Sequence, residues 1–233
     1  MEQVNFSAFS ARDVEDIALQ RTGQLKRLPG LGPVSFRAWE RGHRLPLQIE
    51  SRLRRRPILQ GALDAVAREV EKITDYVGDR PVRRLVDIGC GQGLADLVFW
   101  RKYRCHIHLV DIERTDDKHH AYHAKGAGYA SLKAARKFLM DNGVPASDIK
   151  TTNPRRDELV DGDVDLIVSM ISAGFHYPIS TYTDFAIRAL RGGCALVFDA
   201  RKKTGQEEAL SGFARVDVIA EGPKHNKLAA IKG

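Results

Sequence analysis

The chain has 233 residues, of which 43% are hydrophobic and 29% are charged, a composition typical of globular proteins. Its 37 Lys and Arg residues against 30 Asp and Glu residues give a formal net charge of +7, which suits an acidic partner such as RNA, phosphate or an anionic glycan. No apolar run approaches the roughly 18 residues of a membrane span, and the absence of a secretory pattern and of CxxC spacing favours a cytoplasmic protein without a zinc site.

Residues 1–57 differ in sequence pattern from the rest of the chain and are expected to form an N-terminal extension, partly helical and partly irregular. Ser10, followed three residues later by Asp13, resembles a capping box, and apolar residues at helical spacing come after it. Prolines and glycines crowd residues 29–33 and are expected to end that helix, with an irregular segment after them. The run RLRRR at Arg52–Arg56 is a dense basic cluster. Such runs usually lie on a solvent-exposed surface without a specific role, and the alternative is that these arginines bind phosphate groups.

Residues 58–233 are expected to form a single α/β domain. Six apolar residues from Leu59 to Val77 step by four and three, which places them on one face of a long helix. Beyond it, short apolar runs alternate with helical patterns, and this predicts crossover connections and a mainly parallel sheet. A short polar turn, EGPKHN, joins the last two runs, so they are expected to form an antiparallel hairpin. The helical patterns lie at 94–103, 130–141 and 180–191, and the seven expected strands at 85–88, 106–111, 148–152, 164–170, 194–199, 215–220 and 227–231.

The stretch VDIGCGQG at Val86–Gly93 joins the first strand to the helix that follows. Glycine has no Cβ and accepts left-handed dihedrals, so such a turn lets main-chain amides at a helix N-terminus approach a ligand closely. The glycines alternate, and the sixth position of a dinucleotide-binding GxGxxG motif is occupied by Leu94, which disfavours a nicotinamide-dependent oxidoreductase. Asp87 lies two residues before the first glycine.

VDIGCGQG and the LVD that ends at Asp111 resemble the class I S-adenosylmethionine-dependent methyltransferases, over roughly residues 60–233. The resemblance implies a Rossmann-like sheet of seven strands with a C-terminal antiparallel hairpin, and S-adenosyl-L-methionine as cofactor. It implies that Asp87 lies near the methionyl amino group and that Asp111 binds both ribose hydroxyls, since a carboxylate has two acceptor oxygens for the two donors of a diol. The residues that pass close under the cofactor are Gly89, Cys90, Gly91 and Gly93.

Three further residues are assigned to the cofactor by the same resemblance. Ile112 would pack on the adenine, Asn153 would hydrogen-bond the adenine amino group, and Ser169 ends the fourth strand beside the site. Simpler roles remain open for several of these positions. Asp87 could cap the turn, Asn153 could form an Asx-turn before the following proline, and Ile112 could belong to the core.

The stretch SMISAGFHYPISTY at Ser169–Tyr182 is expected to be the loop at which an acceptor meets the sulfonium, because ligands of open parallel sheets bind beyond the carboxyl ends of the strands. A neutral imidazole can remove a hydroxyl proton near neutral pH, so His176 is the candidate base, with Tyr177 and Phe175 shaping the pocket. The alternative is a histidine that only bonds its own loop. Asp199 and Arg201, at the end of the fifth strand, are expected to face the site edge, where either could contact an acceptor or the two could form a surface ion pair.

These features predict methylation of a hydroxyl on a small molecule or sugar. An Asn/Asp-Pro-Pro-aromatic motif is absent, and Ser169 stands where metal-dependent enzymes would need an aspartate, so no metal is expected. The polar stretch 113–129, with three histidines, is expected to be a mobile loop and not a metal site. The alternatives are an RNA methyltransferase that uses the basic N-terminal segment and a non-catalytic cofactor-binding module. The extension could cover the site, contact the acceptor or mediate a homodimer.

Overall fold

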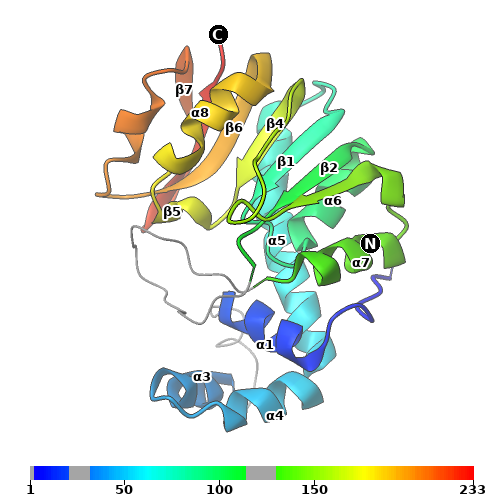
Figure 1. The fold of residues 1–233 in the computed structure, drawn as a ribbon. Coiled ribbons are helices and arrows are strands. Elements are labelled where there is room, and N and C mark those ends of the chain that lie inside the picture. The colour runs from blue at the N-terminus through cyan, green and yellow to red at the C-terminus, as the bar shows by residue number, and fades with distance from the viewer. Residues whose placement is uncertain (1–2, 21–31, 114–129) are drawn as a thin grey trace.

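The computed structural model describes residues 3–20, 32–113 and 130–233. Its centre is a seven-stranded sheet in the order β3-β2-β1-β4-β6-β8-β7 (Figure 1). The pairs from β3 to β6 are parallel, whereas β8 runs antiparallel to both β6 and β7. All seven expected strands and the final hairpin are therefore confirmed. The strands are β1 (Arg84–Ile88), β2 (His106–Val110), β3 (Ile149–Thr152), β4 (Val164–Ser169), β6 (Leu190–Arg201), β7 (Arg215–Glu221) and β8 (His225–Ile231).

Helices cover both faces of the sheet, and each face has its own apolar core. Successive residues of one strand belong to different cores: Leu85 packs with the first and Val86 with the second. Strands that are buried on both faces need such near-continuous apolar runs, which is why the runs were visible in the sequence. The first core contains α5 (Arg55–Val77), α6 (Leu94–Tyr103) and α7 (Leu132–Asp141). The second contains α8 (Ser180–Ala189) and the 3-10 turn η2 (Gln206–Leu210), while a second 3-10 turn, η1 (Ala146–Asp148), precedes β3.

The N-terminal extension is more helical than expected. The capping box is confirmed, because the Asp13 carboxylate accepts from the Ser10 amide at 2.7 Å and the Asp13 amide donates to the Ser10 hydroxyl at 3.2 Å. The expectation of an irregular segment up to residue 57 is wrong for the described residues, which form α3 (Gly32–Glu40), α4 (Leu45–Leu53) and the start of α5. Pro33 and Pro46 lie in first turns, where a missing amide donor costs nothing. The first helix is α1 (Ala11–Gln20), and its buried side chains share the core of α5.

The stretch expected as a loop after β4 forms a strand, β5 (Ser172–Tyr177), and then enters α8. β5 lies outside the seven-stranded sheet and packs against the end of β6. Gly174, at a φ of 87°, permits this approach, because a Cβ there would overlap the ring of Phe198 and lie 3.0 Å from the Asp199 carbonyl oxygen. Within the described residues, no helix combines the length and the apolar character that a membrane crossing requires.

Candidate functional site

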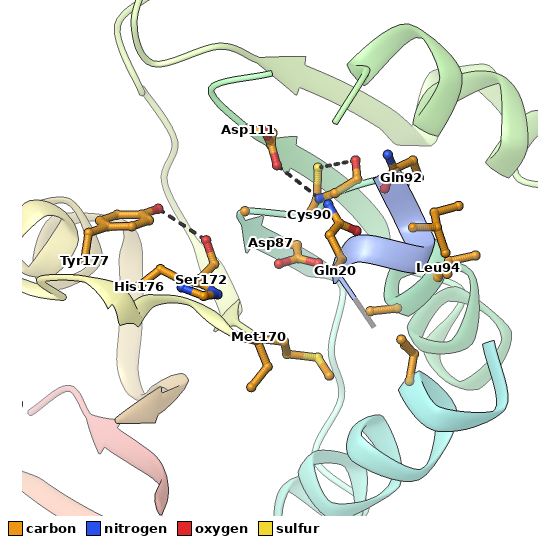
Figure 2. Close-up of a pocket in the computed structure, with 16 residues that line it drawn as sticks. Gln20, Asp87, Cys90, Gln92, Leu94, Asp111, Met170, Ser172, His176 and Tyr177 are labelled. Atoms are coloured by element: carbon orange, nitrogen blue, oxygen red, sulfur yellow. Dashed lines mark hydrogen bonds between the residues drawn. The ribbon is translucent and has the colours of Figure 1, made fainter. Parts of the chain in front are cut away.

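A cavity opens at the carboxyl ends of β1, β2 and β4, beside α1 (Figure 2). Ligands of open parallel sheets bind at this edge. Together with the solvent at its mouth, the cavity holds about 930 Å³. It is lined by the turn after β1, by Asp111 after β2, by the chain from Met170 into β5, and by Ile17 and Gln20 of α1. Val66 of α5 lines it as well, so the structure brings together residues from five separate parts of the chain.

The turn after β1 presents main chain to the cavity. Gly89 and Gly91 take φ values of 78° and 59°, in the region that favours glycine. The Gly89 amide donates to the Val110 carbonyl at 2.7 Å, and a Cβ on Gly89 would overlap the side chain of Ser172 across the cavity. Cys90 lies between the two glycines, and burial raises the pKa of its thiol well above the ordinary value, so the thiol stays protonated near neutral pH.

Two buried carboxyl groups lie beneath this turn. Asp87 lines the cavity and Asp96 belongs to α6, and both side chains are buried. Burial raises the pKa of Asp96 to about 7, and the interaction with Asp87 opposes that rise. Two buried carboxyl groups in contact cannot both ionise cheaply, so one proton is shared between them. The sequence analysis missed Asp96, although a lone carboxylate in the apolar run LADLVF was a signal for it.

Asp111 is held at the other end of the turn by two main-chain amides. One carboxylate oxygen accepts from the Gly91 amide at 3.1 Å and the other from the Glu113 amide at 2.8 Å. Burial raises the pKa of Asp111 to about 6, and the two amides oppose the rise. Each carboxylate oxygen has capacity for more than one hydrogen bond, so both oxygens can still accept from a ligand.

The opposite side of the cavity comes from β5. Ser172, His176 and Tyr177 all line it, and the Ser172 and Tyr177 hydroxyls lie 3.3 Å apart (Figure 2). Burial raises the pKa of the Tyr177 phenol well above its ordinary value, so this group stays neutral. The neighbouring Phe175, expected to shape the pocket, is not among the residues that line the cavity, and its ring meets the edge of the His176 ring with the ring centres 4.9 Å apart.

A buried ion pair fixes the turn that leads into β5. Asp199 Oδ1 lies 2.6 Å from Lys227 Nζ, and both side chains are only 2% exposed. The other oxygen of Asp199 accepts from the Ile171 amide at 2.9 Å, and Lys227 also lies 3.7 Å from Glu69. Of the two alternatives considered for Asp199, a surface ion pair with Arg201 is therefore wrong, because its partner is the buried Lys227. Asp199 positions Ile171, a residue that lines the cavity.

Two of the expected cofactor residues lie outside the cavity lining and have other partners. Gly93 is the N-cap of α6, at a φ of 78°, and a Cβ there would lie 3.5 Å from Ala135. Ser169 is fully buried, and its hydroxyl lies within hydrogen-bonding distance of the carbonyls of Ile88 and Ala173, at 3.0 and 3.2 Å. Gly93 therefore connects the turn after β1 to α6, and Ser169 is the last residue of β4.

Asn153 and Ile112 are also absent from the lining. The side-chain oxygen of Asn153, Oδ1, accepts from the Arg155 amide at 3.0 Å, which is the Asx-turn geometry considered above. Its amide nitrogen lies 3.3 Å from the Ile112 carbonyl and 3.1 Å from Glu113. Ile112 is half-buried. The polar stretch that was expected to form a mobile loop lies almost wholly outside the described residues, from 114 to 129.

The contribution of the extension to the site was not visible in the sequence. Ile17 and Gln20 of α1 line the cavity, as does Val66 of α5. The Gln20 amide lies beside Gly91, since a Cβ on that glycine would come within 3.3 Å of it. Such contacts depend on how α1 packs in the fold, and no local spacing encodes them.

No protein-family model matches the chain, and no curated protein sequence does. Solved structures do resemble it. A 16S rRNA methyltransferase from T. thermophilus, in complex with AdoMet and guanosine, shares 18% identity over 72% of this chain and 43% of its own, with a TM-score of 0.50. A ribosomal protein methylase from Lactobacillus delbrueckii subsp. bulgaricus shares 20% identity over 74% of this chain and 80% of its own, with a TM-score of 0.52.

A third similar structure is the geranyl diphosphate C-methyltransferase of Streptomyces coelicolor, in complex with S-adenosyl-L-homocysteine. It shares 10% identity over 76% of this chain and 83% of its own, with a TM-score of 0.55. The chain spans less than half the length of the rRNA methyltransferase. At these identities the likeness is one of fold: the chain has the class I S-adenosylmethionine-dependent methyltransferase fold.

Proposed function

We propose that the protein is an S-adenosyl-L-methionine-dependent methyltransferase that acts on a hydroxyl group of a small molecule or sugar. The observation that carries this proposal is the cavity in which the glycine turn and Asp111 face His176. The similar structures are named as methyltransferases that act on RNA, a ribosomal protein and geranyl diphosphate. The acceptor must therefore be argued from this chain's own residues.

The glycine side of the cavity suits the cofactor. Asp111 has acceptor capacity on both oxygens for the ribose diol, and its two amide bonds hold the carboxylate in one orientation. Asp87 is a buried carboxyl that lines the cavity, and a charge-assisted bond to the methionyl ammonium would stabilise its ionised form. Gly89 and Gly91 line the cavity together with these two carboxyl groups, and the side chains of Ser172 and Gln20 lie next to the two glycines.

Catalysis would then consist mainly of placing the two reactants in line. Bound S-adenosyl-L-methionine would supply an electrophilic sulfonium methyl, which the acceptor oxygen would take as the carbon–sulfur bond breaks and S-adenosyl-L-homocysteine forms. His176 accepts the hydroxyl proton as the new carbon–oxygen bond forms and later releases that proton to solvent. Tyr177 keeps its proton and can donate a hydrogen bond in the same space.

The RNA alternative has less support from the N-terminal arginines. Arg55 donates to the carbonyl oxygens of Phe6, at 2.8 Å, and of Phe9. Arg54 pairs with the buried Glu50 at 3.3 Å. Two of the four arginines in Arg52–Arg56 thus hold the extension together and are not simply available to phosphates.

Cofactor binding can be tested by calorimetry with S-adenosyl-L-methionine and S-adenosyl-L-homocysteine. Asp111→Asn should weaken binding by about 10- to 100-fold, because hydrogen bonds to a charged group contribute about 1.5–3 kcal/mol. Asp184→Asn changes an exposed carboxylate of α8 and should bind as the wild type does. Absence of binding to the wild-type protein would refute the proposal.

The acceptor class is tested by following S-adenosyl-L-homocysteine release with hydroxylated metabolites, nucleotide sugars and total RNA. With an active acceptor, His176→Gln should lower kcat by about 10²- to 10⁴-fold and remove the acidic limb of the pH–rate profile. Turnover on RNA alone, with a steep fall in affinity as salt rises, would replace the small-molecule proposal with the RNA one.

A further inference from the structure

A group of basic residues lies where β6 ends and β8 begins, at the same edge of the sheet as the cavity. Arg201 pairs in register with His225 across the two strands, and the Lys202 amide donates to the Lys224 carbonyl at 3.0 Å. Lys203 follows in the same turn, and the three lysines are exposed. We call Arg201, Lys202, Lys203, Lys224 and His225 the basic lip.

Two nitrogen atoms of the basic lip are buried without a partner. Arg201 Nη1 and His225 Nδ1 have no hydrogen bond to any described residue and almost no contact with solvent. Native proteins satisfy nearly all buried polar atoms, so these two nitrogens are candidates for a hydrogen bond to a bound group. The neighbouring carboxylate, Asp199, is paired with Lys227 at 2.6 Å and also lies 3.5 Å from His225 Nε2, so it faces the other ring nitrogen of His225 and not Nδ1.

The ring of Phe175 brings these two side chains together. The Arg201 guanidinium lies 5.2 Å from the centre of the Phe175 ring, and the His225 ring meets the same ring edge-on at 5.3 Å. Phe175 also contacts His176 at 4.9 Å, and His176 lines the cavity. The orphaned nitrogens are thus separated from the proposed base by a single aromatic ring.

We infer that Arg201 and His225 bind a phosphate group of a small acceptor, remote from the hydroxyl that is methylated. This inference rests on the proposed function, because it uses His176 to mark the reacting end. A guanidinium held against an aromatic ring presents its donors as a fixed fork that matches phosphate oxygens. The three exposed lysines add a positive field that draws an anion to the lip. Binding energy from this remote group would orient the hydroxyl for in-line attack.

A phosphorylated small molecule fits better than a nucleic acid. The two orphaned atoms define a compact, partly buried point of recognition, whereas an RNA strand needs a basic track along its backbone. Arg54 and Arg55, in the other basic cluster of the chain, are held by protein partners. Arg52 and Arg56 of that cluster are exposed, so two of its four arginines remain for phosphates, against the three exposed lysines of the basic lip.

Calorimetry with inorganic pyrophosphate tests the inference, with S-adenosyl-L-homocysteine titrated separately. Wild-type protein should bind pyrophosphate, and Arg201→Gln should lower that affinity by at least about tenfold. Arg201→Lys should restore only part of it, because the charge returns without the fork. Arg188→Gln, at an exposed arginine of α8, is the matched control and should bind as the wild type does. Nucleoside binding should be equal in all four proteins, which also shows that the variants are folded.

Three results would overturn the inference. Equal pyrophosphate affinity in Arg201→Gln and wild type would remove Arg201 from the site. Acetate binding as tight as pyrophosphate binding would assign the lip to carboxylates. Tight binding of an oligoribonucleotide that Arg201→Gln weakens, without binding of pyrophosphate, would assign it to RNA. Failure of S-adenosyl-L-homocysteine to bind would instead count against the proposed function, and the pyrophosphate result would still decide the role of the lip.

Discussion

The two sides of the cavity are held by different means. On the glycine side, formed by the turn after β1 and by Asp111, main-chain amides make the contacts, as between Gly91 and Asp111 at 3.1 Å. On the β5 side, formed by residues 170–177, the Ile171 amide also donates to a carboxylate, that of Asp199, but this carboxylate is in turn held by a buried side chain, Lys227, at 2.6 Å. Contacts made by main-chain amides survive most substitutions, except where a glycine is replaced and the added Cβ would overlap a neighbour. Contacts made by buried side chains are lost when either partner is replaced, so we expect the β5 side to be the more sensitive to substitution.

The largest effect is expected on the β5 side, at Lys227. Lys227→Met leaves the Asp199 carboxylate buried without its cation, and breaking such a pair costs about 3–5 kcal/mol of stability. The double variant Asp199→Asn, Lys227→Met should recover most of this loss, since an asparagine oxygen can still accept from the Ile171 amide. Urea unfolding of the variants measures both values.

The control for this prediction is Lys137→Met, which removes an exposed pair with Asp141 on α7. Such pairs contribute less than about 1 kcal/mol. If the single Lys227 variant and the double variant proved equally unstable, the pair would not be what supports the β5 side, and the contrast between the two sides would fail.

The glycine side should be sensitive at Gly89 above all. Gly89→Ala combines a left-handed backbone, about 1 kcal/mol, with overlap against Ser172, about 1–3 kcal/mol, so stability should fall by about 2–4 kcal/mol. Gly143→Ala is the matched control: its φ is 90°, but its Cβ would meet nothing within 4 Å. It should lose about 1 kcal/mol and keep its affinity for S-adenosyl-L-methionine. Thermal unfolding measures the stability of the two variants, and calorimetry measures their affinity for S-adenosyl-L-methionine. Equal losses of stability in Gly89→Ala and Gly143→Ala would show that the close approach of Ser172 to Gly89 is irrelevant.

Beneath the glycine side, Asp96 should make stability depend on pH. Burial raises its pKa from 3.8 to about 7, so the folded protein holds a proton that the unfolded chain releases. The stabilisation is complete below about pH 4 and is lost as pH rises through 7, at up to about 1.4 kcal/mol per pH unit. Asp96→Asn cannot ionise and should have a flatter slope across this window.

Urea unfolding at several values between pH 4 and pH 8 measures that slope. Asp111, whose pKa is also raised, to about 6, contributes equally to both proteins, so the difference in slope isolates Asp96. Asp184→Asn should keep the wild-type slope. An unchanged slope in Asp96→Asn would mean that Asp87 and Asp96 do not share a proton.

The contrast between the two sides also explains what the sequence could predict. The sheet was predictable because strands buried on both faces need apolar runs, and the turn after β1 because alternating glycines have few other uses. The β5 side was predicted as a set of residue types but with the wrong local structure. Gly174 and Pro178 are typical of a loop, yet the glycine serves the close approach of β5 to Phe198.

The remaining errors have the same origin in tertiary packing. Pro33 and Pro46 suggested an irregular chain, although each lies in the first turn of a helix, where proline is tolerated. Ile17 and Gln20 reach the cavity only because α1 packs beside the turn after β1. The partnership of Asp199 with Lys227 joins residues on adjacent antiparallel strands, at paired positions of β6 and β8, and required the register of the hairpin.

The smallest effect is expected at Tyr177, and it tests whether the β5 side holds one proton acceptor or two. Tyr177→Phe removes a buried hydroxyl that lies 3.3 Å from the Ser172 hydroxyl, a loss of about 1 kcal/mol of stability. Because burial raises the pKa of this phenol well above its ordinary value, the group stays protonated throughout the working range. The variant should therefore keep the shape of the wild-type pH–rate profile with whichever acceptor is found, while His176→Gln loses the acidic limb. A Tyr177→Phe profile that loses a limb would transfer the role of base from the imidazole to the phenol.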